Sequence, residues 1–241
     1  MGRVGVRDSE LCRACRMVPP QFARAAAFGV YEGRLKEAIH ALKYGRIEGA
    51  ARGLGRMLAE AIAHLAGEAP EEMLVVPVPL HRSKSSQRGF NQARLLAAEA
   101  IGFVKKRHPG WRLTLAPRTL MRLRATASQA GLNPRQRRLN VRGAFSVFDA
   151  GAVAGRNILL VDDILTTGAT AREAARVLME AGAATVWVAT LARAQRASQA
   201  HGDAVEEEWD SERQADGPPP MMPPERMTWA EELPSRERAS S

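Results

Sequence analysis

Two adjacent carboxylates stand where a short apolar segment gives way to a loop of small, hydroxyl-bearing residues. Residues 158–161 are Ile-Leu-Leu-Val, and Asp162 and Asp163 follow them directly. Residues 166–170 are Thr-Thr-Gly-Ala-Thr. The apolar run is typical of a buried strand, and residues 171–181 predict an amphipathic helix that ends at a glycine. In a parallel α/β sheet, ligands bind where the carboxyl end of a strand meets such a loop.

The loop has the features of a phosphate site. Glycine allows close backbone approach, threonine hydroxyls add donors, and the following helix offers its positive N-terminal end. The acidic pair is suited to accept hydrogen bonds from sugar hydroxyls, or to help hold a Mg²⁺ ion that bridges to substrate oxygens. A pentose 5-phosphate meets both requirements. The predicted contact residues are Asp162, Asp163, Thr166, Thr167, Gly168, Ala169 and Thr170.

Other protein classes also end a strand in two aspartates. A P-loop NTPase needs a Gly-x-x-x-x-Gly-Lys-Ser/Thr loop, and this chain contains no Gly-Lys pair. A phosphoacceptor receiver domain places its acidic pair near its start, whereas here only one more strand is expected, at residues 185–191. A plain strand exit followed by a helix cap is the structural alternative.

A second anion site is predicted after an earlier buried strand at residues 74–80. The loop that follows carries Arg82, Lys84 and Arg88 among serines, and a helix runs from there to about residue 105. Several cations at a strand-to-helix turn suit a pyrophosphate group. A solvated basic loop is the alternative, but a phosphate loop at another strand tip favours the anion site.

A polar stretch at residues 124–142 is predicted to be a mobile basic lid. It follows a strand region at residues 113–123 that is broken at Pro117, and it precedes a short strand at residues 143–147. A connection rich in arginine and glutamine can close over a charged substrate and exclude water.

The N-terminal part is predicted to supply packing elements. A short strand is expected at residues 28–31, followed by helices at residues 35–42 and from about residue 50 to 65. The lysines of the first helix, Lys43 among them, are expected to be mostly solvated.

Cys12 and Cys15 form a Cys-x-x-Cys pair, which is half of a zinc knuckle. A closed structural zinc site needs four ligands, so a histidine or a second chain would have to complete it. A reduced, metal-free pair is equally compatible with the sequence. A redox role is less favoured, because no thioredoxin-like strand precedes the pair.

Charge divides the chain into a basic body and an acidic tail. Residues 1–194 hold 30 Lys and Arg against 15 Asp and Glu, whereas residues 195–241 hold 5 Arg against 11 acidic residues. A basic body implies an anionic partner, either a phosphorylated substrate or a nucleic acid. Aromatic residues make up 5% of the chain, which gives little support for base stacking on exposed rings.

The composition also predicts how the chain divides into three segments and in which cellular compartment the protein is found. We expect an N-terminal segment at residues 1–70, an α/β domain at residues 71–194 and a disordered acidic, proline-rich tail at residues 195–241. No apolar run reaches membrane-spanning length, the first residues lack the apolar core of a signal peptide, and the cysteine pair fits a reducing compartment. The expected location is the cytoplasm.

Residues 11–194 resemble the ComF family, phosphoribosyltransferase-like proteins of bacteria. The strand, acidic pair and Thr-Gly-x-Thr loop resemble the phosphoribosyl pyrophosphate (PRPP) motif of type I phosphoribosyltransferases. The other matching segments are Cys12-x-x-Cys15, His40-Ala41-Leu42-Lys43-Tyr44, Pro77-Val78-Pro79-Leu80, Arg88-Gly89-Phe90-Asn91-Gln92, Gln129-x-Gly131-Leu132 with Arg135, and Asn140-Val141-x-Gly143-Ala144-Phe145. ComF-like chains usually carry four N-terminal cysteines, and this chain has one pair.

The resemblance implies an α/β type I phosphoribosyltransferase fold: a mostly parallel sheet of about five strands, flanked by helices. It implies that the acidic pair holds the ribose hydroxyls of PRPP, with Mg²⁺, and that the loop holds the 5-phosphate. The lid resembles the flexible loop of glutamine-dependent amidophosphoribosyltransferases, which implies that Arg124, Thr126, Gln129 and Arg135 lie over the substrate. Arg124, Gln129 and Arg135 are the catalytic candidates among them. Zn²⁺ at the cysteine pair stays open.

Two functions follow from this resemblance, and a third, a scaffold that binds partners through the tail at residues 195–241, stays open beside them. The first is a phosphoribosyltransferase that releases pyrophosphate, with an unidentified acceptor. The second, also implied by the resemblance, is a non-catalytic accessory protein for DNA uptake in natural competence, acting with a helicase on incoming single-stranded DNA. No membrane partner is expected, and a homo-oligomer is compatible with the sequence.

Overall fold

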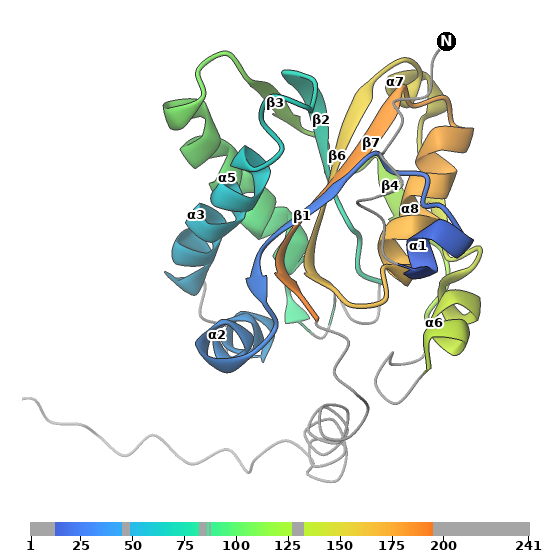
Figure 1. Ribbon diagram of the computed structural model, residues 1–241, viewed down its shortest axis with the longest axis horizontal. Coiled ribbons are helices and arrows are strands. Elements are labelled where there is room, and N and C mark those ends of the chain that lie inside the picture. The colour runs from blue at the N-terminus through green and yellow to red at the C-terminus, as the bar shows by residue number, and fades with distance from the viewer. Residues whose placement is uncertain (1–12, 45–48, 82–85, 87, 127–132, 195–241) are drawn as a thin grey trace, which may run out of the picture. The chain divides into compact units, whose positions relative to one another are not determined.

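The computed structural model describes residues 13–44, 49–81, 86, 88–126 and 133–194 of the chain. Five parallel strands form its central sheet, in the order β1-β7-β6-β2-β3 (Figure 1). The predicted sheet of about five mostly parallel strands is therefore confirmed. The strands are β1 (Ala25–Val30), β2 (Glu72–Pro77), β3 (Arg112–Leu115), β6 (Asn157–Leu165) and β7 (Thr185–Arg193).

The two longest strands, β6 and β7, are nearly continuous apolar runs because helices cover both faces of the sheet. Side chains along β6 alternate between these faces. Leu159 and Val161 belong to one buried apolar cluster, whereas Ile158 and Leu160 belong to the other. This alternation decides which helices the following residues of β6 can meet.

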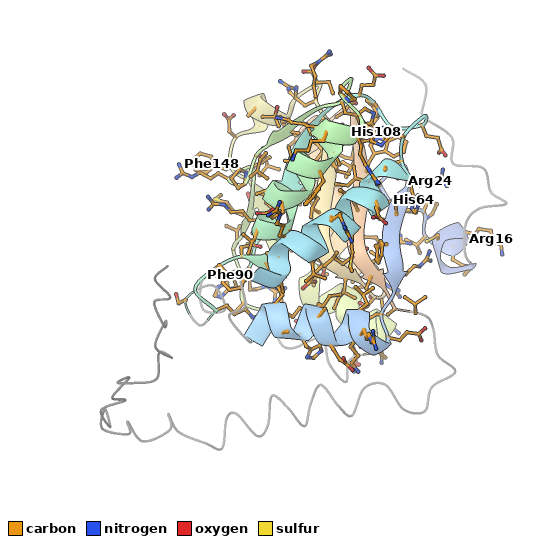
Figure 2. The ribbon with its side chains drawn as sticks, turned by 90° about the vertical axis from the view of Figure 1, so that its left-hand side faces the viewer. Arg16, Arg24, His64, Phe90, His108 and Phe148 are labelled. Atoms are coloured by element: carbon orange, nitrogen blue, oxygen red, sulfur yellow. The ribbon has the colours of Figure 1, made fainter. Side chains whose placement is uncertain are left out.

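Three helices cover the first face: α2 (Gly33–Tyr44), α3 (Gly49–Ala63) and α5 (Gln92–Arg107). Figure 2 views this layer from outside, with Phe90 and His108 marking the two ends of α5. Helix α3 lies close against α5, and a Cβ atom added at Gly55 would come within 2.3 Å of the Glu99 Cβ. Glycine is therefore required there by packing rather than by its backbone angles.

The second face carries α8 (Ala169–Glu180) with the short helices α1 (Arg13–Met17) and α7 (Ala150–Val153) (Figure 1). Next to them lies a small unit that we call the hood. It consists of the antiparallel strands β4 (Leu120–Arg122) and β5 (Phe145–Val147) and helix α6 (Pro134–Val141). The predicted break at Pro117 is confirmed, since β3 ends before it and β4 begins after it.

Part of the predicted lid is a regular helix. Asn133 begins α6 with a capping box: its side chain accepts the N–H of Gln136, whose own side chain accepts the N–H of Asn133. Such reciprocal bonds stabilise a helix start. The predicted mobile lid at residues 124–142 therefore includes a regular helix at residues 134–141, which the sequence did not predict. Residues 127–132 lie outside the described part, and the mobility of the lid stays a prediction.

The N-terminal elements belong to the same sheet and core as the rest. Strand β1 pairs with β7 along its length, and α2 and α3 bury Ile39, Leu42 and Leu58 completely. The sheet and its core therefore run across the division drawn at residue 70. Among the described residues, no helix combines the length and apolar character that crossing a membrane requires.

Candidate functional site

The sheet has a switch point between β2 and β6. From β2 the chain continues through α5 to β3 on one side, and from β6 it continues through α8 to β7 on the other side. The β2–β6 ladder ends at the pair Pro77–Val161. Ligands of open α/β sheets bind in the crevice outside the carboxyl ends of such strands.

A pocket of ≈ 180 Å³ lies at this switch point. It is lined by the residues after β2, by the start of α5 and by the carboxyl end of β6. Side chains from α2, α8 and the hood complete the lining. Its lining residues are Lys43, Val78, Pro79, Leu80, Arg88, Asn91, Gln92, Ala93, Arg122, Thr126, Asp162, Asp163 and Thr170. The structure thus brings both acidic residues, Thr170 and Arg88 of the predicted site together.

Asp163 shares a face of β6 with Leu159 and Val161, so it meets α2 and α5. Its Oδ2 atom lies 3.1 Å from the Lys43 ammonium nitrogen and accepts a 3.4 Å hydrogen bond from Gln92 Nε2. Burial opposes ionisation of Asp163, but the Lys43 charge and these hydrogen bonds outweigh it and hold its pKa below the ordinary value. Asp163 is therefore an ionised, internally paired carboxylate.

Asp162 points to the opposite face and has a different environment. Its Oδ1 atom accepts the backbone N–H of Asp163 at 2.9 Å. Burial, reinforced by the neighbouring Asp163 charge, raises the pKa of Asp162 to about 8. At neutral pH this carboxyl keeps a proton that an arriving cation can displace. The two adjacent aspartates thus have pKa values shifted in opposite directions: burial dominates at Asp162, whereas the ion pair with Lys43 outweighs burial at Asp163.

The loop after β6 makes a tight turn into α8. Gly168 is the residue before the helix and has φ = +74°, a conformation that strains other residues. No side chain caps this helix start; Thr167 Oγ1 accepts the Ala169 N–H at a long 3.4 Å. Thr166 is exposed and Thr170 lines the pocket. The positive end of α8 is therefore directed to the crevice side of the turn.

The cations around the pocket come from three segments. Arg88 lines it and acts electrostatically on Asp163, whereas Arg82 and Lys84 lie outside the described residues. Arg122, on β4 of the hood, was not predicted. Its guanidinium stacks over the Phe145 ring at 5.4 Å and donates to Thr126 Oγ1.

Arg122 is unusually buried for a cation. Its Nε atom is buried and has no hydrogen-bond partner within the described structure. Burial lowers the pKa of Arg122, and the nearby Asp162 partly opposes this shift. A signal existed in the sequence: Arg122 is two residues after Leu120, which is buried, and residues two apart share a face of a strand.

The expectation that Lys43 is solvated was wrong. Its side chain is 15% exposed and contacts Asp163. Lys43 follows Ile39 by four residues and Leu42 by one, and both are fully buried. Residues four apart lie on one face of a helix, so the spacing itself placed Lys43 toward the core.

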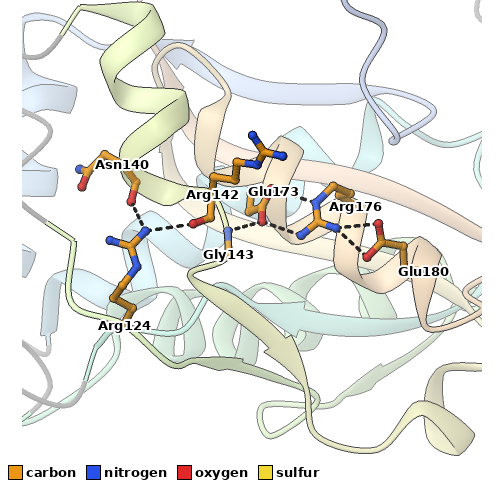
Figure 3. A network of polar contacts seen from close by, with 7 residues as sticks. All are labelled: Arg124, Asn140, Arg142, Gly143, Glu173, Arg176 and Glu180. Carbon is orange, nitrogen blue, oxygen red and sulfur yellow. Dashed lines mark hydrogen bonds and ion pairs between the residues drawn. The ribbon is translucent and has the colours of Figure 1, made fainter.

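Of the residues that the resemblance places over the substrate, Thr126 lines the pocket, whereas Arg124 and Arg135 do not. Arg124 Nη2 donates to the carbonyl oxygens of Asn140 and Arg142, each at 2.9 Å (Figure 3). Arg135 is exposed at the start of α6, and Gln129 lies outside the described residues. Arg124 thus holds the end of α6 against β4 in this conformation. The catalytic role of all three stays a prediction.

The cysteine pair is only partly described. Cys15 Sγ accepts a 3.1 Å hydrogen bond from Arg172 on α8, and Cys12 lies outside the described residues. Within the part of the chain that the structure covers, no group of three His, Cys, Asp or Glu side chains is placed to hold a metal. Zinc at Cys12 and Cys15 stays a prediction.

Comparisons with known proteins identify the domain and the family of this chain. Residues 115–217 match the family model described as "Phosphoribosyl transferase domain". This region includes the hood, β6 with its acidic pair, α8 and β7. The match and the sheet order together identify a type I phosphoribosyltransferase domain.

Relatives cover most of the chain. The "DNA utilization protein YhgH" of Escherichia coli O157:H7 is 35% identical over 184 residues, which are 76% of this chain and 77% of the relative. The "Competence protein ComFC" of Bacillus subtilis is 32% identical over 79% of this chain and 69% of its own length. The "Competence protein F" of Haemophilus influenzae is 28% identical over 76% and 78%, respectively. This chain therefore belongs to the ComF family and carries its phosphoribosyltransferase domain.

Proposed function

We propose that the protein binds PRPP with Mg²⁺ in the pocket between β2 and β6, and transfers its phosphoribosyl group with release of pyrophosphate. The observation that carries this proposal is the meeting of three features at one switch point. These are the acidic pair Asp162–Asp163, the Gly168 turn at the start of α8, and the cations Lys43, Arg88 and Arg122. A ligand with hydroxyls in its middle and phosphates at both ends matches this set.

Each part of PRPP has a matching group. The turn at residues 166–170 offers backbone N–H groups and a helix N-terminus to the 5-phosphate. Arg88 is suited to the pyrophosphate, as are the predicted Arg82 and Lys84. Mg²⁺ fits a site with one or two carboxylates and substrate oxygens, and Asp162 and Asp163 are the residues that would hold it. When bound, the ion would neutralise charge on the departing pyrophosphate.

The protein's share in the transfer is electrostatic. An acceptor displaces pyrophosphate at C1 of the sugar: the new bond to C1 forms, the bond to pyrophosphate breaks, and positive charge develops on the ring. Fixed charges aimed at such developing charge are usually the largest catalytic contribution. Asp163, Arg88 and Arg122 all line the pocket. In the proposed complex the carboxylate would face the positive charge that develops on the sugar, and the two guanidinium groups would face the anionic leaving group or acceptor.

Calorimetric titration of PRPP with Mg²⁺ tests the proposal. Wild type should bind saturably, and Asp162→Asn/Asp163→Asn should bind at least about a hundredfold more weakly, because charged hydrogen bonds are each worth about 1.5–3 kcal/mol. Glu37→Gln, an exposed acid on the same helix as Lys43, is the control and should bind as wild type does. A folded wild type that binds no PRPP would end the transferase proposal.

A second candidate function rests on the outer surface of the hood. Arg135, Arg138 and Arg142 are exposed there, the body of the chain is strongly basic, and relatives are named for DNA utilization and competence. These arginines suit the phosphates of single-stranded DNA. Binding of this kind should weaken steeply with salt and should persist in Asp162→Asn/Asp163→Asn. A DNA affinity that ignores salt, or one lost with the acidic pair, would contradict it.

A further inference from the structure

Gln92 is the first residue of α5 and lies deep in the pocket. It is 5% exposed. The preceding Asn91 fixes it there, because Asn91 Nδ2 donates to the Val78 carbonyl at 3.0 Å while its Oδ1 accepts the Arg94 N–H at 3.1 Å. The helix start is therefore tied to the segment after β2, and the Gln92 side chain enters a fixed position.

The orientation of the Gln92 amide is set by its neighbour. Nε2 donates to Asp163 Oδ2 at 3.4 Å. The reverse orientation would put the amide oxygen against a carboxylate, so the network decides the assignment. The Oε1 atom is then left buried and, among the described groups, without a hydrogen-bond partner. A buried acceptor without a partner destabilises the folded state unless a ligand or a water molecule supplies a donor.

The acidic pair is already partly engaged by the protein. Lys43 and Gln92 both contact Asp163 Oδ2, and the Asp163 N–H occupies Asp162 Oδ1. Cations line the pocket as well, and these suit the phosphates of a ligand. Gln92 Oε1 has the opposite preference: it repels a phosphate oxygen and accepts only from an O–H or N–H group.

From this arrangement we infer that Gln92 is a specificity-determining residue, whose Oε1 accepts a hydrogen bond from one ring hydroxyl of the bound sugar phosphate. The inference rests on the proposed function and adds to it a residue that distinguishes ribose from deoxyribose. The sugar must lie beside the acidic pair for its phosphate to reach the turn at Gly168, and the start of α5 forms that wall of the pocket. The hydroxyl supplies the donor that Oε1 lacks.

The experiment compares three probes and three forms of the full-length protein. Ribose 5-phosphate, 2-deoxyribose 5-phosphate and 3-deoxyribose 5-phosphate are titrated, with Mg²⁺ present, into wild type, Gln92→Met and the control Gln136→Met. Methionine keeps the length of glutamine without its acceptor. Gln136 is an exposed glutamine on α6. Circular dichroism checks folding, and Gln92→Asn, which draws the amide back by one methylene, serves if Gln92→Met does not fold.

We expect wild type and Gln136→Met to bind one of the two deoxy sugars about tenfold more weakly than ribose 5-phosphate, as loss of one buried hydrogen bond predicts. In Gln92→Met that difference should disappear. Equal binding of all three sugars by wild type, or an unchanged difference in Gln92→Met, would overturn the inference. So would failure of ribose 5-phosphate to bind a wild type that binds PRPP. Failure to bind PRPP itself would overturn the proposed function too.

Discussion

Two charged clusters of this protein contain similar residues, but they differ in how completely their polar groups are paired. The pocket cluster consists of Lys43, Gln92, Arg122, Asp162 and Asp163. The hood network consists of Arg124, Gly143, Glu173, Arg176 and Glu180 (Figure 3). Each contains two carboxylates and at least one arginine, and the first of them lines the pocket between β2 and β6.

The hood network satisfies its buried carboxylate. Glu173 Oε1 accepts the Gly143 N–H and Arg176 Nη2, both at 2.7 Å. Arg176 Nη1 also reaches both oxygens of Glu180 at 2.6 Å. The hydrogen bond from Arg176 outweighs burial and lowers the pKa of Glu173. Hydrogen bonds to Glu173 and Glu180 in turn raise the pKa of Arg176. These bonds join the segment between α6 and β5 to α8.

The pocket cluster is left incomplete. The only buried side-chain nitrogen and oxygen atoms without partners in the described structure are Gln92 Oε1 and Arg122 Nε, and both residues line the pocket. Burial and the neighbouring Asp163 charge keep the pKa of Asp162 raised to about 8. Native structures rarely leave such groups unmatched without a functional reason. We infer from this difference that the hood network contributes to stability, whereas the pocket cluster is arranged to bind a ligand.

Removing the ion pair between Lys43 and Asp163 should produce the largest change in stability. Lys43→Met leaves Asp163 buried without its ammonium partner, and breaking a buried pair in this way costs about 3–5 kcal/mol. Urea denaturation measures it. Lys106→Met, at an exposed lysine of α5, should change the free energy of unfolding by less than about 0.5 kcal/mol. Similar small effects for both variants would mean that Lys43 does not hold Asp163.

A smaller loss is expected when the hood network is broken. Glu173→Gln should lower the free energy of unfolding by about 1–3 kcal/mol, because the Gly143 N–H and Arg176 lose a charged acceptor. The pKa of Glu173 is lowered in the folded state. The ionised Glu173 therefore contributes to the free energy of unfolding at pH values above the pKa of the unfolded chain, which is about 4.3. The contribution is lost as pH falls through the folded pKa. The free energies of unfolding of wild type and Glu173→Gln, measured by denaturation, should therefore converge as the solution is made acidic. A difference that stays constant with pH would show that it does not come from the charge on Glu173.

The smallest effect should have the opposite pH dependence. The pKa of Asp162 is raised to about 8, so its contribution to stability is full below the unfolded value near about 3.9 and is lost as pH rises through about 8. Asp162→Asn cannot ionise. Its stability relative to wild type should therefore increase as pH rises from 5 to 9. Thermal melts at the two pH values measure this; a difference from wild type that is the same at both would contradict it.

The sequence predicted what lies in one continuous segment. The apolar run, acidic pair and threonine loop at residues 158–170 read directly as a strand, a turn and a helix start, because each feature depends on near neighbours. The break at Pro117 was predictable for the same reason, since proline removes a donor and restricts the backbone. Family resemblance then supplied the sheet.

What the sequence did not predict depends on contacts between distant segments. Lys43 and Gln92 meet Asp163 only once α2 and α5 pack on the same face of the sheet, and Gln92 is separated from Asp163 by 71 positions. Arg122 enters the pocket because β4 pairs with β5. Helix α6 was missed because its arginine-rich composition concealed the capping box at Asn133. Short-range patterns identify elements, and long-range packing decides which polar groups stay unmatched.

The most direct test of the division between the two clusters is the rise in melting temperature that PRPP with Mg²⁺ causes in wild type, Asp163→Asn and Glu173→Gln. At a hundredfold excess over Kd, a ligand that binds only the folded state adds about 2.7 kcal/mol. We predict that Glu173→Gln starts from a lower melting temperature than wild type but rises as much, whereas Asp163→Asn does not rise. A full rise in Asp163→Asn, or none in Glu173→Gln, would contradict the assignment of ligand binding to the pocket cluster and of stability to the hood network.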